Sequence, residues 1–264
     1  MTLLDIFSAG PVVGMVHLLP LPGSPGWGGS MAAVVNRART DARALAGGGL
    51  NGLVVENYGD VPFLPEISQP STIAALSVAV RAVLDEVEIP VGVNVLRNDG
   101  HGALAVAAAT GAAFIRVNVH TGSMFTDQGL LHGRAHETMR LRASLGTDTA
   151  VLADVFVKHA VPPPGIRIED AARDAVERGL ADGLIVSGRA TGSATDPEDL
   201  ERVKAVVSGV PIWVGSGVTA DSVGHLHDLA DGLIVGSALQ ENGVAGNPVD
   251  PARVERLMEA VAAR

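Results

Sequence analysis

The sequences VPIWVGSGVT, residues 210–219, and GLIVGSA, residues 232–238, decide the fold of this chain. Each is a short apolar run that leads directly into a glycine–serine turn, and the two runs lie about one strand–helix unit apart. Glycine lets the main chain approach an oxyanion closely, and a helix that starts after the turn adds positive partial charge. In a parallel βα barrel a phosphate site lies after strands seven and eight, so this pair predicts the last two strands of a barrel.

The rest of the chain supplies the remaining strands. Short β-branched runs alternate with amphipathic segments rich in Ala, Leu, Arg and Glu. The expected strands are 12–18, 52–56, 91–96, 114–119, 150–157, 183–187, 212–215 and 232–236, and the expected helices are 31–47, 70–87, 101–110, 132–145, 168–179, 196–208, 220–229 and 250–263. This order predicts one α/β domain over residues 1–264, a (β/α)8 TIM barrel. An open doubly wound sheet is the alternative, disfavoured because no Gly-x-Gly-x-x-Gly follows the first strand.

Composition narrows the classes of partner. The length of 264 residues suits a single barrel, and 47% of the residues are apolar. The chain has no cysteine, which excludes disulfides, thiolate nucleophiles and Cys-ligated metals and fits a reducing compartment. A net charge of −10 makes nucleic acid and anionic membranes poor partners.

The sequence contains no convincing targeting or membrane segment. Residues 1–21 are apolar, but no Lys or Arg precedes their hydrophobic part as in a signal peptide. The Ala-rich run 102–115 is too short and too interrupted by glycine to span a bilayer. We therefore expect a cytoplasmic protein without membrane insertion. Barrels of this kind often self-associate, so a homo-oligomer remains open.

Polar side chains gather at the C-terminal ends of the predicted strands, where barrel enzymes carry their catalytic groups. Alternation along a strand places Arg116, Asn118 and His120 on one face of the fourth strand. It places Asp154 and Lys158 on one face of the fifth. The apolar residues between them belong under the outer helices, so the polar face is expected to line the barrel.

An arginine inside a barrel needs a carboxylate partner, because an isolated buried charge is very costly. We expect Arg116 to pair with Asp154 or Glu56, and that pair alone could be purely structural. The whole polar set, however, exceeds what a packed barrel interior usually tolerates and indicates an active site. The candidate catalytic residues are His17, Glu56, Asn94, Arg116, Asn118, Asp154 and Lys158.

The roles within this set stay open at the level of sequence. Lys158 is a candidate Schiff-base nucleophile or proton carrier, or simply the partner of a carboxylate. Asp154, Glu56 and His17 are candidate general bases. No cofactor is predicted and no metal ligand is assigned. A divalent metal held by His17, Glu56, Asp154 and His120 is chemically possible, although no short ligand spacing supports it.

The loops after the last three strands share one character. They are rich in glycine and hydroxyl side chains, as an amide-lined anion site requires. The candidate phosphate-binding residues are Ser187, Gly188, Thr191, Gly192, Gly215, Ser216, Gly217, Gly236 and Ser237. Two further loops, 121–131 and 161–166, follow the fourth and fifth strands, and the first has the length and mixed character of a lid.

The chain resembles the BtpA family along its whole length. The matching segments are Val13–Gly23, Val55–Asp60, Pro90–Asp99, Phe114–Val119, Thr126–Gly129, Ala153–His159, Ile185–Gly188 and Val214–Thr219. The resemblance implies a βα barrel related to the phosphate-binding barrels. The family takes its name from members that act in photosystem I biogenesis in oxygenic phototrophs. The resemblance implies no reaction common to the family, and therefore it assigns no catalytic residues in this chain.

Three functions follow from these features. The first is an enzyme acting on a small phosphorylated or otherwise anionic substrate, by isomerisation, an aldol-type or lyase step, or glycosidic-bond chemistry. The second is a non-catalytic factor for the biogenesis or stabilisation of photosystem I or another membrane complex, as the family name suggests. The third is a small-molecule sensor, which would keep the phosphate loops without needing Lys158. Fold alone does not choose among them, so the choice rests on the site.

Overall fold

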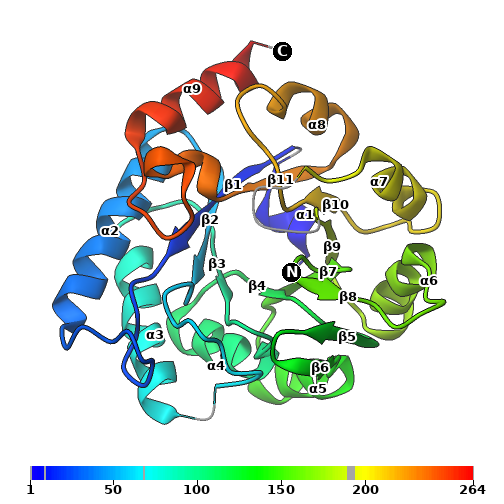
Figure 1. Ribbon diagram of the computed structural model, residues 1–264, viewed down its shortest axis with the longest axis horizontal. Helices are drawn as coiled ribbons and strands as arrows, with labels where there is room; N and C mark the ends of the chain where they lie inside the picture. The colour runs from blue at the N-terminus through cyan, green and yellow to red at the C-terminus, as the bar shows by residue number, and fades with distance from the viewer. Residues whose placement is uncertain (1, 9, 68, 189–193, 264) are drawn as a thin grey trace.

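The computed structural model describes residues 2–8, 10–67, 69–188 and 194–263. Its parallel strands close into a barrel in the order β1-β11-β10-β9-β7-β4-β3-β2, with the helices outside (Figure 1). The barrel strands are β1 Val12–His17, β2 Gly52–Glu56, β3 Val91–Asn94, β4 Phe114–Val117, β7 Ala150–Val155, β9 Gly183–Val186, β10 Ile212–Val214 and β11 Gly232–Val235. Pairing of β1 with β11 closes the ring, which confirms the predicted TIM barrel.

A helix follows each barrel strand and covers the outside of the sheet. These helices are α2 Met31–Gly47, α3 Pro70–Leu84, α4 Gly100–Thr110, α5 Ala135–Leu145, α6 Ile168–Arg173 with a π-helical continuation at Asp174–Arg178, α7 Pro197–Lys204, α8 Val223–Leu229 and α9 Pro251–Ala262. Asp196 and Asp250 cap α7 and α9, each directly ahead of a proline at the first helical position. Among the described residues no helix combines the length and apolarity needed to cross a membrane.

Side chains along each barrel strand alternate between the lumen and the outer helices. In β4, Phe114 packs inside the barrel with Leu152 and Trp213, whereas Ile115 packs outward under the helices. Because the alternation has a period of two, Arg116 follows Phe114 into the lumen, where it is 2% exposed. The same strands therefore provide an apolar floor and, one pleat higher, a polar mouth.

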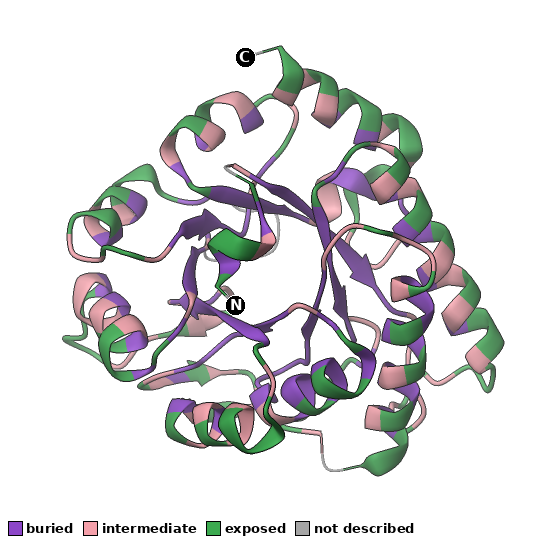
Figure 2. Ribbon diagram, turned by 180° about the vertical axis from the view of Figure 1, so that it is seen from behind, coloured by how far each residue is buried: buried purple, intermediate pink, exposed green. Residues whose placement is uncertain are grey.

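The N-terminal end of the barrel is closed by the segment that precedes β1. The short helix α1, Leu3–Ile6, lies over the centre of the barrel when the molecule is seen from behind (Figure 2). Phe7 follows it and meets Phe114 and Trp213 edge to face, at ring-centroid distances of 5.6 and 5.3 Å. This aromatic cluster forms the floor on which the polar mouth rests.

The C-terminal end carries an additional sheet that the sequence did not reveal. It contains β5 Ser123–Thr126, β6 Gly129–His132 and β8 Ala160–Val161, all antiparallel. The predicted loop 121–131 is thus a hairpin, and the helix expected from residue 132 begins at Ala135. The hairpin forms because Met124 and Leu131 bury one face against the loop after β7, a contact distant in sequence.

Glycine makes room for the rings of the barrel floor. A Cβ added to Gly92 would lie 2.4 Å from the Phe114 ring, and one added to Gly232 would lie 2.7 Å from the Trp213 ring. Real Cβ atoms do not approach so closely, so alanine at either position forces the aromatic side chain to move.

We predict that Gly92→Ala lowers the free energy of unfolding by about 1–3 kcal/mol, because the added methyl group overpacks the barrel floor. Gly47→Ala is the matched control, since a Cβ at this position in α2 meets no atom within 4 Å. Urea unfolding followed by circular dichroism measures both. Equal stability of the two variants would contradict the packing described for the floor.

Candidate active site at the barrel mouth

Arg116 and Asp154 form an ion pair in the middle of the barrel. Arg116 Nε and Nη2 donate to Asp154 Oδ2 and Oδ1 at 3.0 and 2.8 Å, a bidentate geometry. Both side chains are almost completely buried. Of the two carboxylates that the sequence offered to Arg116, the structure pairs it with Asp154, which comes from the neighbouring strand β7.

The carboxylate of Asp154 is fully engaged by protein groups. Besides Arg116, Asn118 Nδ2 donates to Oδ2 at 2.8 Å and Ser187 Oγ donates to Oδ1 at 3.4 Å. These bonds occupy both oxygens, so Asp154 is poorly placed to accept a substrate proton. We assign it a positioning role, which leaves Glu56 and His17 as the candidate proton carriers.

Asn94 supports this network from β3. Its Nδ2 donates to Arg116 O at 3.0 Å and to Asn118 Oδ1 at 3.3 Å. Its own Oδ1 is buried and has no hydrogen-bond partner among the described residues. A buried amide oxygen normally accepts a hydrogen bond. Asn94 Oδ1 is therefore an available acceptor, and Asn94 is paired with Glu56 in the β2–β3 register.

His17 is held in one tautomer. Gln240 Nε2 and the Gly246 backbone N–H both donate to His17 Nδ1, at 2.8 and 3.2 Å. The ring proton therefore resides on Nε2, which lies 3.6 Å from Glu56 Oε1. Tyr58 stacks on the ring at a centroid distance of 4.3 Å. Burial, with a smaller contribution from Lys158, lowers the pKa of His17 to about 3, so the imidazole is neutral at physiological pH.

The pKa of Glu56 is shifted in the opposite direction to that of His17. Its side chain is buried, and burial raises the pKa of this carboxyl despite the opposing charges of Lys158 and Arg116. It therefore holds a proton more readily than an ordinary glutamate does, as a general acid requires. Glu56 and His17 are paired residues on β2 and β1, so a donor imidazole and a protonatable carboxyl lie side by side.

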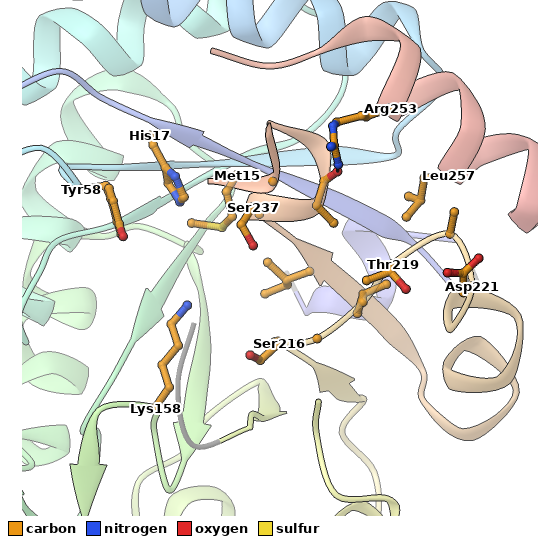
Figure 3. Close-up of a pocket in the computed structure, with 18 of the residues that line it drawn as sticks. Met15, His17, Tyr58, Lys158, Ser216, Thr219, Asp221, Ser237, Arg253 and Leu257 are labelled. Atoms are coloured by element: carbon orange, nitrogen blue, oxygen red, sulfur yellow. Dashed lines mark hydrogen bonds between the residues drawn. The ribbon is translucent and has the colours of Figure 1, made fainter. Parts of the chain in front are cut away.

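Lys158 reaches the mouth by a bend and not by strand alternation. The expected strand to Val157 is wrong: β7 ends at Val155, and Phe156 adopts a left-handed φ of 54°. Such a conformation is uncommon for a bulky residue and often occurs at functional sites. The Lys158 carbonyl accepts a hydrogen bond from Arg97 Nη2 at 2.6 Å, which fixes the bend. Its side chain points into the cavity toward His17 (Figure 3).

A cavity of about 400 Å³ opens beside these groups. Lys158 and His17 lie on one side of it, and Ser216 and Ser237 of the two glycine–serine turns lie on the other (Figure 3). Arg116 also belongs to the lining. Of the predicted phosphate-binding residues, the lining includes Gly215, Ser216, Gly217, Gly236 and Ser237. The turns lie next to each other because β10 and β11 are paired strands. The two turns thus share one cavity with three of the predicted catalytic residues, His17, Arg116 and Lys158, whereas Glu56, Asn94, Asn118 and Asp154 do not line it.

Two arginines of α9 complete the glycine–serine side of this cavity, and the sequence interpretation missed both. Arg253 pairs with Asp250, with Nε and Oδ2 3.6 Å apart. Arg256, one helical turn later, forms no ion pair among the described residues and also lines the cavity. Their signal was the i, i+3 spacing in the helix that follows the last glycine–serine turn. Asp221 also lines the cavity, so its lining includes a carboxyl group besides the two arginines of α9.

A second cavity of about 280 Å³ adjoins the first. Tyr58, Arg116 and Lys158 line both cavities and form their common wall. The second cavity is otherwise lined mainly by Phe63 and Leu96 together with ionisable groups such as Arg97, Asp127, His159 and Glu56. Lys158 therefore lies between an anion-binding lobe and a lobe of mixed polarity.

The remaining predicted residues have other surroundings. Ser187 and Gly188 follow β9, where Ser187 bonds Asp154, while Thr191 and Gly192 lie outside the described residues. His120 bonds Gly179 O through Nε2 at 2.8 Å, away from the cavity lining. In the described part of the chain no group of three or more His, Asp or Glu residues is arranged to hold a metal ion.

Comparison with known proteins places this barrel in a family. The model of the BtpA family matches residues 8–263. A Photosystem I biogenesis protein BtpA from Synechocystis is 50% identical over 252 residues, which cover 96% of this chain and 88% of the relative. An uncharacterized protein from Pyrococcus furiosus is 47% identical over 252 residues, which cover 96% of this chain and 95% of that relative.

Solved structures with the same fold are much more distant in sequence. The phosphoribosyl anthranilate isomerase from Thermus thermophilus superposes with a TM-score of 0.59 at 12% identity, covering 96% of this chain and 98% of its own. The thiamine phosphate pyrophosphorylase from Pyrococcus furiosus gives a TM-score of 0.58 at 15% identity, covering 97% and 96%. At these identities the similarity establishes the barrel alone.

We predict that Asp154→Ala destabilises the protein by about 3–5 kcal/mol, because it leaves Arg116 buried without its counter-charge. Replacing both partners with apolar residues, Arg116→Met and Asp154→Leu, should recover much of that loss. Glu86→Ala, which removes the partly exposed partner of the surface arginines Arg43 and Arg39, serves as the control and should change stability little. Urea unfolding decides between these outcomes, and a double variant as unstable as Asp154→Ala would refute the electrostatic explanation.

We also predict that His17→Gln makes the protein less sensitive to acid. The folded pKa of His17, about 3, lies below that of an unfolded histidine, so the unfolded chain binds more protons between these pH values. Stability therefore falls as the pH drops from about 6.5, by up to about 1.4 kcal/mol per pH unit from this one group.

Urea unfolding at several pH values between about 7 and 4 measures this slope in both proteins. The parent should lose stability more steeply than His17→Gln, whereas His136→Gln, at an exposed position, should follow the parent. Parallel curves for the parent and His17→Gln would show that the buried imidazole is not the acid-sensitive group.

Proposed function

The chain belongs to the BtpA family, and from this premise we propose that it is an enzyme acting on a small phosphorylated substrate. One observation carries the proposal: a single cavity of about 400 Å³ is lined both by the two glycine–serine turns and by Lys158 and His17. A scaffold needs no such cavity, and a sensor needs no amine beside it. The two structural neighbours are named for phosphorylated compounds, which agrees with the proposal.

The phosphate group would bind between the turns and α9. Backbone N–H groups of glycine-rich turns bind phosphate oxygens at close range. Arg256 would add a charge-assisted hydrogen bond, because it has no ion-pair partner among the described residues of the site. Ser216 and Ser237 add hydroxyl donors from the two turns.

The reactive part of the substrate would lie against Lys158, Glu56 and His17. Glycosidic-bond chemistry becomes the weakest of the predicted reactions, because it uses two carboxyl groups and Asp154 is engaged by Arg116. A protonatable Glu56 beside the neutral donor His17 suits proton transfer to or from a carbonyl compound. We therefore favour an isomerase or an aldol-type or lyase reaction.

A role in the biogenesis of photosystem I or another membrane complex is the second candidate. The Synechocystis relative that carries this name is 50% identical to this chain over 252 residues, which are 96% of this chain and 88% of the relative. Leu130, Phe125 and Val161 face one another across the small sheet and are 45%, 48% and 64% exposed, an apolar row suited to contact with another protein.

We predict that phosphorylated sugars stabilise the parent protein against heat. A ligand at about 100 times its dissociation constant adds about 2.7 kcal/mol, which raises the melting temperature of a domain this size by roughly 5–10 °C. Ser216→Asp should abolish the shift by repelling the anion, and Arg256→Ala should weaken it. Arg43→Ala, on the surface of α2, should respond like the parent.

A thermal-shift series with ribose 5-phosphate, glucose 6-phosphate and inorganic phosphate tests these expectations. The unphosphorylated sugars provide the matched ligand control. If no phosphate raises the melting temperature, or if Ser216→Asp responds as strongly as the parent, the glycine–serine turns are not an anion site.

A further inference from the structure

Lysine is rare in this chain. Lys and Arg together number 19, and lysine occurs only at positions 158 and 204, which leaves 17 arginines. One of the two lysines lies at the barrel mouth, where a purely electrostatic role would suit arginine equally well. Arginine cannot provide a neutral amine, because its guanidinium group stays protonated. The rarity of lysine therefore points to the amine of Lys158 as a reactive group.

The two lysines differ in their surroundings. Lys204 Nζ donates to Leu229 O at 2.6 Å and lies 3.3 Å from Asp231 Oδ1 at the surface. Lys158 Nζ forms no hydrogen bond or ion pair with the residues that the structure describes. Burial, and next the charge of Arg116, lower the pKa of Lys158, which increases the fraction of neutral amine at physiological pH.

The position of Lys158 also limits the shape of its reaction partner. Its side chain lies between the cavity of about 400 Å³ with the glycine–serine turns and the cavity of about 280 Å³ lined by Phe63 and Leu96. A carbon atom bonded to Nζ would thus have space on both sides. A ketone, with one substituent in each cavity, fits this arrangement better than an aldehyde does.

We propose that Lys158 forms a covalent Schiff base with a phosphorylated ketone whose phosphate binds at Ser216, Ser237 and Arg256. This inference rests on the proposed function, because the anion loops hold the phosphate end. The neutral amine attacks the carbonyl carbon, a C–N bond forms, and a proton passes from nitrogen to the carbonyl oxygen. A second proton on that oxygen lets it leave as water while the nitrogen lone pair forms the C=N bond.

Glu56 and His17 lie where this sequence needs a proton. The pKa of Glu56 is raised by burial, and among the residues that the structure describes its ion-pair partner is His17, with Nε2 3.6 Å away, so it suits protonation of the departing oxygen. The iminium nitrogen then draws electrons from the adjacent carbon, which weakens its C–H or C–C bond. Isomerase and aldol-type or lyase reactions both proceed through such a step.

Reductive trapping tests the Schiff base directly. The parent protein is incubated with dihydroxyacetone phosphate or ribulose 5-phosphate and cyanoborohydride, which reduces C=N to a stable secondary amine, and the site is found by peptide mass mapping. We expect an adduct at Lys158 that forms about tenfold faster or more than any at Lys204. Inorganic phosphate should slow it, and unphosphorylated dihydroxyacetone and ribulose should give far less.

Two variants and one independent measurement keep the outcomes distinct. Lys158→Arg keeps the charge and should lose the adduct, whereas Lys204→Arg should label like the parent. Melting temperatures with the same ketones report binding without reaction. If the ketone phosphates raise the melting temperature but leave no adduct at Lys158, the Schiff base is refuted and the phosphate site stands. If the ketone phosphates neither bind nor label the protein, both proposals fail. If Lys158 is labelled but inorganic phosphate does not slow the labelling, the amine is reactive and the phosphate site is refuted.

Discussion

The bidentate pair of Arg116 and Asp154 is the interaction on which the rest of this barrel depends. Two opposite charges inside a closed sheet are tolerated only when the geometry satisfies both, and here Asn118 and Ser187 complete the bonding of the carboxylate. The pair lies above an apolar floor of Phe7, Phe114 and Trp213 and below an open mouth. It therefore marks the level at which the lumen changes from apolar side chains to ionisable ones.

The same pair sets the electrostatics of the mouth. Burial lowers the pKa of Lys158 most and the charge of Arg116 lowers it further, while the charges of Glu56 and Asp154 oppose this shift. Burial favours the neutral form of both neighbouring groups, because it lowers the pKa of His17 and raises the pKa of Glu56. The amine, the donor and the proton carrier that we propose for the reaction thus lie in one desolvated environment.

Much of the candidate site could be predicted from the sequence. The alternation in β4 was enough to turn Arg116 inward and to require a carboxylate partner, and the strand-end positions of Glu56 and His17 followed from the barrel. The sequence analysis did not predict Arg253 and Arg256 as site residues, because the contact between helix α9 and the turn after β11 depends on the tertiary structure of the barrel. The hairpin of β5 and β6 was missed for a similar reason, since its partner β8 lies beyond α5 and β7.

The sequence by itself determined the barrel, because eight apolar strands separated by helices have few other ways to bury both faces of a sheet. It also determined which strand ends carry ionisable groups and which of these groups share a face, because side chains alternate along a strand with a period of two. Tertiary structure alone decided that Asp154 and not Glu56 pairs with Arg116, and that Lys158 lies between two cavities. Those outcomes depend on strand register and on the left-handed bend at Phe156, which are set by contacts far apart in the chain.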